Sequence, residues 1–128
     1  MVVVLDDARA ALRAQTEAAY ASFRHRAIAP LTQIADNLFV LELFHGPTLA
    51  FKDFAMQLLA ELADDRLAAT KRRATIIGAT SGDTGSAAIE AFRGRERVDV
   101  VIFYPHGRVS DVQRRQMTAV DAANVHAV

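Results

Sequence analysis

The sequence predicts an α/β fold, in which a helical N-terminal segment precedes a parallel, three-layer sheet. Segments with helical periodicity alternate with short apolar runs of strand length along the 128 residues, as in folds built from strand–helix–strand crossovers. The runs are continuously apolar, which is typical of parallel strands covered on both faces. Turn signals rich in glycine, proline and small polar residues separate the segments.

The N-terminal third is expected to contain one helix and one strand. Residues 6–26 carry apolar side chains at helical spacing, and Asp6 or Asp7 can cap the start. A proline interrupts this pattern, so residues 27–37 are expected to form a loop or turn. Residues 38–44 (LFVLELF) have the length and composition of a strand, which ends at the turn signal His-Gly-Pro.

The rest of the chain alternates between strand and helix patterns. Strands are expected at residues 74–79, at 98–104 and from 124 onward. Helices are expected at residues 51–69, from the segment 80–85 to about residue 92, and from Ser110 onward. Ser110 and Gln113 have the spacing of a capping box. The sequence stops inside the last predicted strand, which leaves a sheet edge without a partner, so we expect the natural chain to continue.

Composition indicates a globular, cytoplasmic protein. The chain is 52% hydrophobic, and 15 basic residues balance 15 acidic ones, so charge gives no reason to expect nucleic acid or a membrane as partner. The absence of cysteine excludes disulfides and thiolate chemistry. No apolar run is long enough to cross a bilayer, and the start does not resemble a signal peptide. We expect one structural unit, in which a helical segment (residues 1–37) precedes a partial α/β domain (residues 38–128).

Only two of the 15 basic residues are lysines, Lys52 and Lys71, so chemistry that needs a primary amine has two side chains available. Lys52 lies between Phe51 and Phe54. Apolar surroundings favour the neutral amine, which is the nucleophilic form. The alternative is a lysine whose ammonium group reaches past these residues to water. Lys71 lies in a basic loop and is expected to be solvated.

The segment Ser81–Gly85 (SGDTG) follows a predicted strand and opens a helix. The free N–H groups and the dipole at a helix start suit an anion, and the hydroxyls of Ser81 and Thr84 add donors. The segment matches neither a phosphate-binding loop nor a dinucleotide fingerprint, and a simple tight turn is the alternative. The four histidines lack the spacing of metal ligands, so we expect no metal site.

Three segments resemble signatures of threonine synthases. They are Leu41–Ala55 (LELFHGPTLAFKDFA), Ala79–Ala88 (ATSGDTGSAA) and Val101–Ser110 (VIFYPHGRVS). Threonine synthases are pyridoxal-phosphate (PLP) enzymes of fold type II, which includes tryptophan synthase β. The resemblance covers most of the chain from about Tyr20 onward, and two long motifs in the right order make it specific.

The resemblance implies conversion of O-phospho-L-homoserine and water into L-threonine and phosphate, with no nucleic acid or membrane as partner. Lys52 falls on the catalytic lysine that binds PLP as a Schiff base. The substrate carboxylate would be held by four residues of the turn, namely Ser81, Gly82, Thr84 and Gly85. Asp83 falls on a cofactor-binding position at which relatives outside this branch carry asparagine. An ionised carboxylate there would repel the phenolate oxygen of the cofactor unless it is protonated or turned away.

Threonine synthases are several times longer than this chain. The resemblance does not extend to the later glycine-rich loop that holds the cofactor phosphate or to most of the large domain. We therefore expect a truncated chain that does not make threonine by itself. The alternatives are a non-catalytic α/β module and another PLP-dependent lyase, such as a serine or threonine dehydratase. An unpaired sheet edge would also favour self-association.

Overall fold

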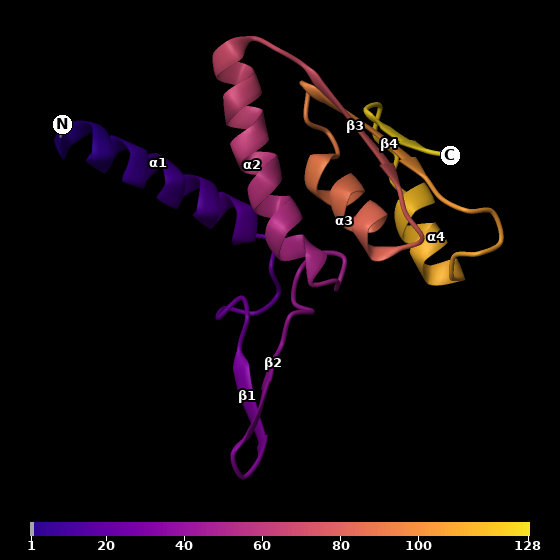
Figure 1. Ribbon diagram of the computed structural model, residues 1–128, viewed down its shortest axis with the longest axis horizontal. Helices are drawn as coiled ribbons and strands as arrows, with labels where there is room; N and C mark the ends of the chain where they lie inside the picture. Colours follow the sequence, from indigo (N-terminus) through magenta and orange to yellow (C-terminus); the bar gives the residue numbers. More distant parts are fainter. Residues whose placement is uncertain (1) are drawn as a thin grey trace.

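A computed structural model describes residues 2–128, with side chains from residue 7 onward. The described chain contains four helices and five strands in two sheets (Figure 1). In chain order they are α1 (Val2–Tyr20), β1 (Leu31–Ala35), β2 (Leu38–Leu41), α2 (Lys52–Thr70), β3 (Ala74–Ala79), α3 (Asp83–Phe92), β4 (Val98–Phe103), α4 (Asp111–Thr118) and β5 (Val125–Ala127). None of the described helices has the length and hydropathy needed to cross a membrane.

The larger sheet has three parallel strands in the order β3–β4–β5. β3 pairs with β4 along its whole length, and the shorter β5 pairs with β4 from Val100↔Val125 onward. One helix lies in each connection, α3 between β3 and β4 and α4 between β4 and β5. The structure confirms the predicted α/β class and its parallel sheet.

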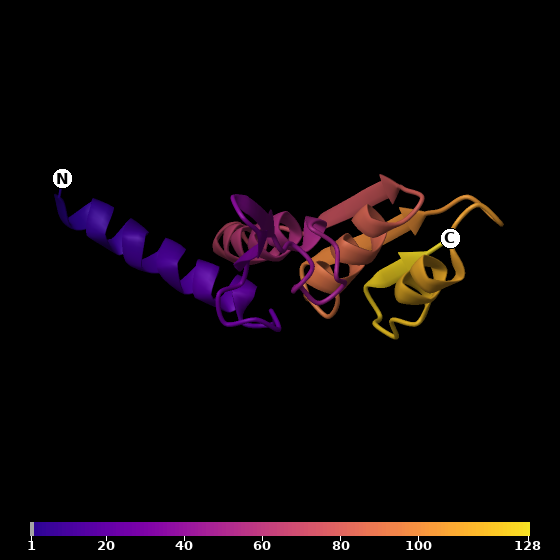
Figure 2. The same cartoon turned by 90° about the horizontal axis from the view of Figure 1, so that it is seen from below.

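Helices cover one face of this sheet in the described chain (Figures 1 and 2). α2, α3 and α4 contribute to one core with Val98, Val100 and Ile102 of β4, which are at most 2% exposed. On the opposite face Ile77 is 71% exposed and Phe103 is 46% exposed. The core therefore lies between the sheet and these three helices.

α3 is the central helix of the core because most of its side chains are small or apolar. It packs against α2, α4 and β4, and Ile89 and Phe92 are at most 1% exposed. Burial of one such side chain contributes about 1.5–3 kcal/mol. Packing of α3 therefore also holds the turn that precedes it at a defined place on the sheet edge.

An aromatic cluster joins the end of α1 to α2. Ring centroids lie 5.2 Å apart for Tyr20 and Phe23 and 4.9 Å apart for Phe23 and Phe54. The Tyr20 hydroxyl also donates to the backbone oxygen of Phe54 at 3.1 Å. Gln15 of α1 donates to Asp65 of α2, whereas the N-terminal part of α1 projects away from α2 (Figure 1).

The first helix differs from the predicted span of residues 6–26. It begins at Val2, so Asp6 and Asp7 lie within it and do not cap it. It ends at Tyr20 because the next aromatic residue leaves the helix to pack against α2. The expectation of a capped start was therefore wrong.

The expectation of a loop over residues 27–37 was also wrong, because part of this segment is a strand. β1 pairs antiparallel with β2, and all side chains of both strands are exposed. Asn37, with a φ of 57°, forms the tight turn between them. β2 therefore belongs to a hairpin outside the parallel sheet, and it ends at Leu41 rather than at residue 44. The hairpin therefore crosses the predicted boundary between the segments 1–37 and 38–128.

Candidate active site

The predicted site residues lie at one end of the parallel sheet, beyond the carboxyl ends of its strands. The turn Ser81–Gly85 leaves β3 at this end, and α2 begins with Lys52 at the same end of the molecule (Figure 1). The Thr80 N–H donates to the Phe103 oxygen at 2.9 Å, which ties the end of β3 to the end of β4. In open α/β sheets, ligands bind at this end, beyond the carboxyl ends of the strands.

Lys52 carries an amine that is not neutralised by a carboxylate. Its side chain is half-buried, and its Nζ lies 4.8 Å from the centroid of the Phe51 ring. None of the ion pairs among the described residues includes Lys52. Lys71 is exposed at the other end of α2, roughly 28 Å away at the rise of an α-helix. The two primary-amine side chains therefore have different environments.

Asp53, next to Lys52, is fully buried and binds the preceding loop instead of the lysine. Its carboxylate accepts from the Thr48 N–H at 2.8 Å and from the Thr48 hydroxyl at 2.7 Å. A Cβ atom at position 46 would collide with this carboxylate, so the close approach requires Gly46. The first turn of α2 also favours a negative charge. Asp53 thus holds the loop in front of Lys52 in one shape.

The same loop contains a strained residue. Leu49 has a φ of 67° although it is not glycine, a conformation that costs roughly 1–2 kcal/mol for an L-residue with a Cβ atom. Its N–H donates to the Gly46 oxygen at 3.2 Å, and its side chain is 52% exposed. Strain that persists in an exposed loop indicates that neighbouring contacts determine the loop shape.

The turn Ser81–Gly85 exposes three polar side chains, while its two glycines are buried. Ser81, Asp83 and Thr84 are exposed, whereas Gly82 and Gly85 are buried. α3 begins at Asp83 without a side-chain cap. The Gly85 N–H donates to the Gly82 oxygen at 3.0 Å, so the N–H groups of Asp83 and Thr84 and the positive end of the helix dipole are available to an anion. The predicted turn is present before α3, and its binding of an anion stays a prediction.

Asp83 accepts a hydrogen bond from Gln113 of α4, a residue that the sequence predicts as part of a capping box. The Gln113 Nε2 group donates to Asp83 Oδ1 at 2.8 Å. The predicted capping box is half confirmed, because the Ser110 Oγ accepts from the Gln113 N–H at 3.3 Å. The Gln113 side chain does not return to the Ser110 backbone, since it accepts from the Ser110 hydroxyl and reaches Asp83 instead.

A second glutamine of α4 was missed entirely. The Gln116 Nε2 group donates to the Thr48 backbone oxygen at 3.2 Å. An open hollow of about 340 Å³ lies between α4 and the two loops, lined in part by Thr48, Asp83, Gln113 and Gln116. No spacing rule connects Gln116 to Thr48, which lies 68 residues earlier. Lys52 and the turn are thus linked through α4, because no hydrogen bond or ion pair of the described residues joins them directly.

The strand that leads into the Lys52 loop is fixed by a polar pair at the base of the hairpin. His45 Nε2 lies 2.6 Å from Glu42 Oε2, and the Thr32 hydroxyl donates to Glu42 Oε1 at 2.9 Å. The hydrogen bond with His45, followed by that from Thr32, lowers the pKa of Glu42 below its ordinary value. The Arg24 N–H donates to the His45 oxygen at 2.8 Å. These contacts attach the hairpin and the end of α1 to the loop.

Comparison with known proteins identifies the relatives of this chain. No model of a protein family matches the sequence. Threonine synthase of Pseudomonas aeruginosa is 59% identical over 112 residues, which cover 88% of this chain and 24% of that protein. A crystal structure of PLP-bound threonine synthase from Brucella melitensis superposes with a TM-score of 0.87 and 61% identity, covering 92% of this chain and 25% of the other. Yeast threonine synthase superposes with a TM-score of 0.83 and 45% identity over 88% of this chain and 24% of the other.

The chain spans about a quarter of the length of these relatives. Similarity over that quarter is high in both sequence and structure, and it covers nearly all of the present chain. The chain is therefore similar, in sequence and in fold, to one quarter of a threonine synthase.

Proposed function

We propose that Lys52 binds PLP covalently and that the turn Ser81–Gly85 holds the substrate carboxylate, in a protein that converts O-phospho-L-homoserine and water into L-threonine and phosphate. One observation carries the proposal: the Lys52 amine, which forms no ion pair with the described side chains, lies at the same end of the sheet as the uncapped start of α3. The PLP-bound relative from Brucella melitensis, 61% identical to this chain, supports it.

The residues present fit this cofactor. An aldehyde is bound covalently by a primary amine, and Lys52 is the half-buried one of the two lysines. Arginine, the other basic residue of the chain, does not give up its proton and cannot replace it. When bound, PLP withdraws electrons from the carbon atoms next to the substrate amino group.

Lys52 would also move protons once the substrate amine has taken its place on the cofactor. An amine near neutral charge can take a proton at Nζ and return it to another carbon atom. Asp53 does not interfere, because its carboxylate is buried against Thr48. The loop therefore fixes the backbone at Lys52, while the side chain with its Nζ group can still move.

The turn would bind and orient the substrate. N–H groups of the first turn of α3, with the hydroxyls of Ser81 and Thr84, match the oxygens of a carboxylate. Gly82 and Gly85 are buried, and a Cβ atom at either position would collide with neighbouring side chains, so glycine lets the turn pack closely while its exposed residues face the ligand. Asp83 lines the hollow next to the Lys52 loop, and we assign it to the cofactor side, with its carboxylate held by Gln113.

Competition between substrates tests this proposal against its alternatives. The 128-residue chain is mixed with PLP, reduced with borohydride so that the cofactor becomes permanently attached, and the label on the Lys52 peptide is measured. O-phospho-L-homoserine should lower this label more than L-serine at equal concentration, because its amine competes with Lys52 and its carboxylate fits the turn. Greater competition by L-serine would indicate a dehydratase. No label on the wild-type chain would indicate a non-catalytic module and would overturn the proposal.

Turnover is a separate question for this chain. We do not expect the 128-residue chain to release phosphate from O-phospho-L-homoserine, because we assign none of its residues to the cofactor phosphate. A steady-state assay of phosphate release with added PLP measures this. Sustained release that depends on Lys52 would contradict the expectation and would place a complete site in these residues.

A further inference from the structure

We infer that α4 positions the Lys52 loop and the Ser81–Gly85 turn relative to each other, with Gln113 and Gln116 as the positioning residues. The inference rests on the proposed function for the roles of the two loops. It concerns how they are held, and neither glutamine needs to touch the substrate or the cofactor.

Gln113 fixes the turn through two contacts. Its Nε2 group donates to Asp83 Oδ1 at 2.8 Å, across 30 residues of sequence. Its side chain also lies directly on Gly82, where a Cβ atom would collide with the amide group. The start of α3 and the side chain of Asp83 are therefore both shaped by α4.

Gln116 fixes the loop through the backbone. Its Nε2 group donates to the Thr48 oxygen at 3.2 Å, and Thr48 in turn donates twice to the buried Asp53. This series of contacts ends at the residue next to Lys52. α4 is thus connected to the loop that carries the amine, although it begins 59 positions after Lys52 in the sequence (111 against 52).

α4 itself is anchored, so the two contacts have a common reference. Gln113 and Gln116 are three residues apart and lie on one side of the helix. Met117 is 1% exposed in the core, and Ser110 caps the helix start. One anchored helix therefore determines the distance across the hollow between the two loops.

Reversing the polarity of one hydrogen bond tests the role of Gln113. Gln113→Glu places a carboxylate against Asp83 and should raise amide hydrogen exchange of Gly85 and Ser86, which donate to the Gly82 oxygen, about tenfold. Gln113→Glu combined with Asp83→Asn restores a donor and an acceptor with the original net charge. The double variant should return exchange to within about twofold of wild type. A failure of this rescue would overturn the role of Gln113.

Truncation of the second glutamine tests the role of Gln116. Gln116→Ala should raise exchange of the Thr48 and Leu49 amides about fivefold to tenfold, with exchange within α4 unchanged. Arg115→Ala, an exposed position on the same helix, is the matched control and should leave the loop unchanged. Equal acceleration in the loop and in α4 would show that Gln116 only stabilises its own helix, and no acceleration in the loop would also overturn the inference.

The same samples separate this inference from the proposed function. The exchange measurements need no cofactor, so they decide the role of α4 even if PLP does not label the wild-type chain. Where label is found, Gln116→Ala should slow labelling of Lys52 at least threefold, whereas Arg115→Ala should not. Loss of label with unchanged exchange would contradict a positioning role.

Discussion

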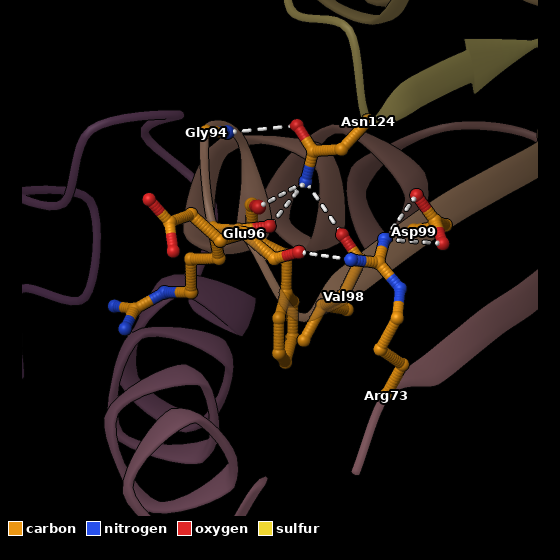
Figure 3. A network of polar contacts seen from close by, with 8 residues as sticks. Arg73, Gly94, Glu96, Val98, Asp99 and Asn124 are labelled. Carbon is orange, nitrogen blue, oxygen red and sulfur yellow. Dashed lines mark hydrogen bonds and ion pairs between the residues drawn. The ribbon is translucent and has the colours of Figure 1, made fainter. Parts of the chain in front are cut away.

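The two ends of the parallel sheet are built differently. At the amino ends of the strands, side chains satisfy backbone groups and one another in a dense polar network (Figure 3). At the carboxyl ends, the Lys52 amine has no ionic partner among the side chains described from residue 7 onward, the start of α3 has no side-chain cap, and Leu49 is strained. The comparison teaches that the amino end pairs its polar groups within the protein, whereas the carboxyl end carries the groups that we propose for a ligand.

Asn124 is the centre of the network at the amino ends. Its Nδ2 group donates to the backbone oxygens of Phe92 at 2.9 Å, Arg95 at 3.3 Å and Val98 at 2.7 Å. Its Oδ1 accepts from the Gly94 N–H at 2.8 Å. One side chain therefore ties the end of α3 and the start of β4 to the residue that precedes β5.

Arginines extend this network over the neighbouring surface. Arg73 donates to the Glu96 oxygen at 2.6 Å and pairs with Asp99 at 3.1 Å (Figure 3). Arg95 pairs with two acidic residues of α2, Glu61 at 2.6 Å and Asp64 at 3.1 Å. The amino end thus joins β3, β4, α3 and α2 through polar groups that are paired with one another.

The largest loss of stability is expected at Asp53, the buried carboxylate near the carboxyl ends of the strands. Asp53→Ala removes two hydrogen bonds to a buried carboxylate and should lower the free energy of unfolding by about 3 kcal/mol. It should also reduce PLP labelling of Lys52 under conditions in which the chain remains folded. Urea unfolding measures the first effect, with Thr48→Val as a partial variant that should lose about 1 kcal/mol. A loss below that of Thr48→Val would contradict the role of Asp53.

Asn124→Ala should affect stability alone, which sharpens the comparison. It removes the side-chain partner of three carbonyl oxygens and one N–H group, although the Phe92 and Arg95 oxygens still accept from backbone N–H groups. It should cost about 2 kcal/mol of unfolding free energy, measured by urea. Asn124→Asp should be no better, because its carboxylate would face the same three oxygens. At urea-free conditions, labelling of Lys52 should match that of wild type. A loss of labelling as large as in Asp53→Ala would show that the two ends are not separable.

A smaller effect is expected between the two ends, at Glu90 of α3. Burial raises the pKa of Glu90, the Arg93 guanidinium partly opposes this, and the charge of Asp53 adds to it. The folded state therefore holds this proton more tightly than the unfolded state, so stability falls as the pH rises from the unfolded pKa through the folded one.

Glu90→Gln should remove this part of the pH dependence. The difference in unfolding free energy, variant minus wild type, should increase as the pH rises from acid to neutral. Comparison across pH is needed because the variant also loses the 2.9 Å contact between Glu90 and Arg93. A difference that stays constant or decreases with pH would contradict the raised pKa.

The smallest effect is expected for Arg73→Ala. The pair with Asp99 is exposed on both sides, at 62% and 37% of the side chains, and such pairs contribute about 0.2–1 kcal/mol. The change should shrink further at high salt. A loss above that of Asn124→Ala would place the centre of the network at the arginine.

Local patterns predicted the elements that carry the proposed site, but not the contacts between them. Helical periodicity placed Lys52 at the start of α2, and small residues placed the Ser81–Gly85 turn before α3, as the structure confirms. The roles of these residues stay predictions. A strand was predicted where β2 lies, but β1 and the β1–β2 hairpin were missed, because both strands are exposed and lack a buried face that would give alternation.

The contacts around the site depend on pairings that no spacing rule describes. Asp53 reaches Thr48 five residues earlier, which is not the spacing of a capping box, and Gln116 reaches Thr48 across 68 residues. Gln113 matched a known pattern, yet its side chain binds Asp83 because α4 packs against the start of α3. Tertiary packing therefore decides which local option each side chain uses.

The most direct test of this account is the position of the cofactor on the two lysines. The chain is reduced with borohydride in the presence of limiting PLP, and labelled peptides are quantified by mass spectrometry, with Lys52→Ala and Lys71→Ala as matched variants. We predict that Lys52 takes at least ten times more label than Lys71, and that Lys52→Ala removes most of the total label whereas Lys71→Ala does not. Equal label on both lysines, or total label that is unchanged in Lys52→Ala, would contradict the assignment of Lys52 as the reactive amine.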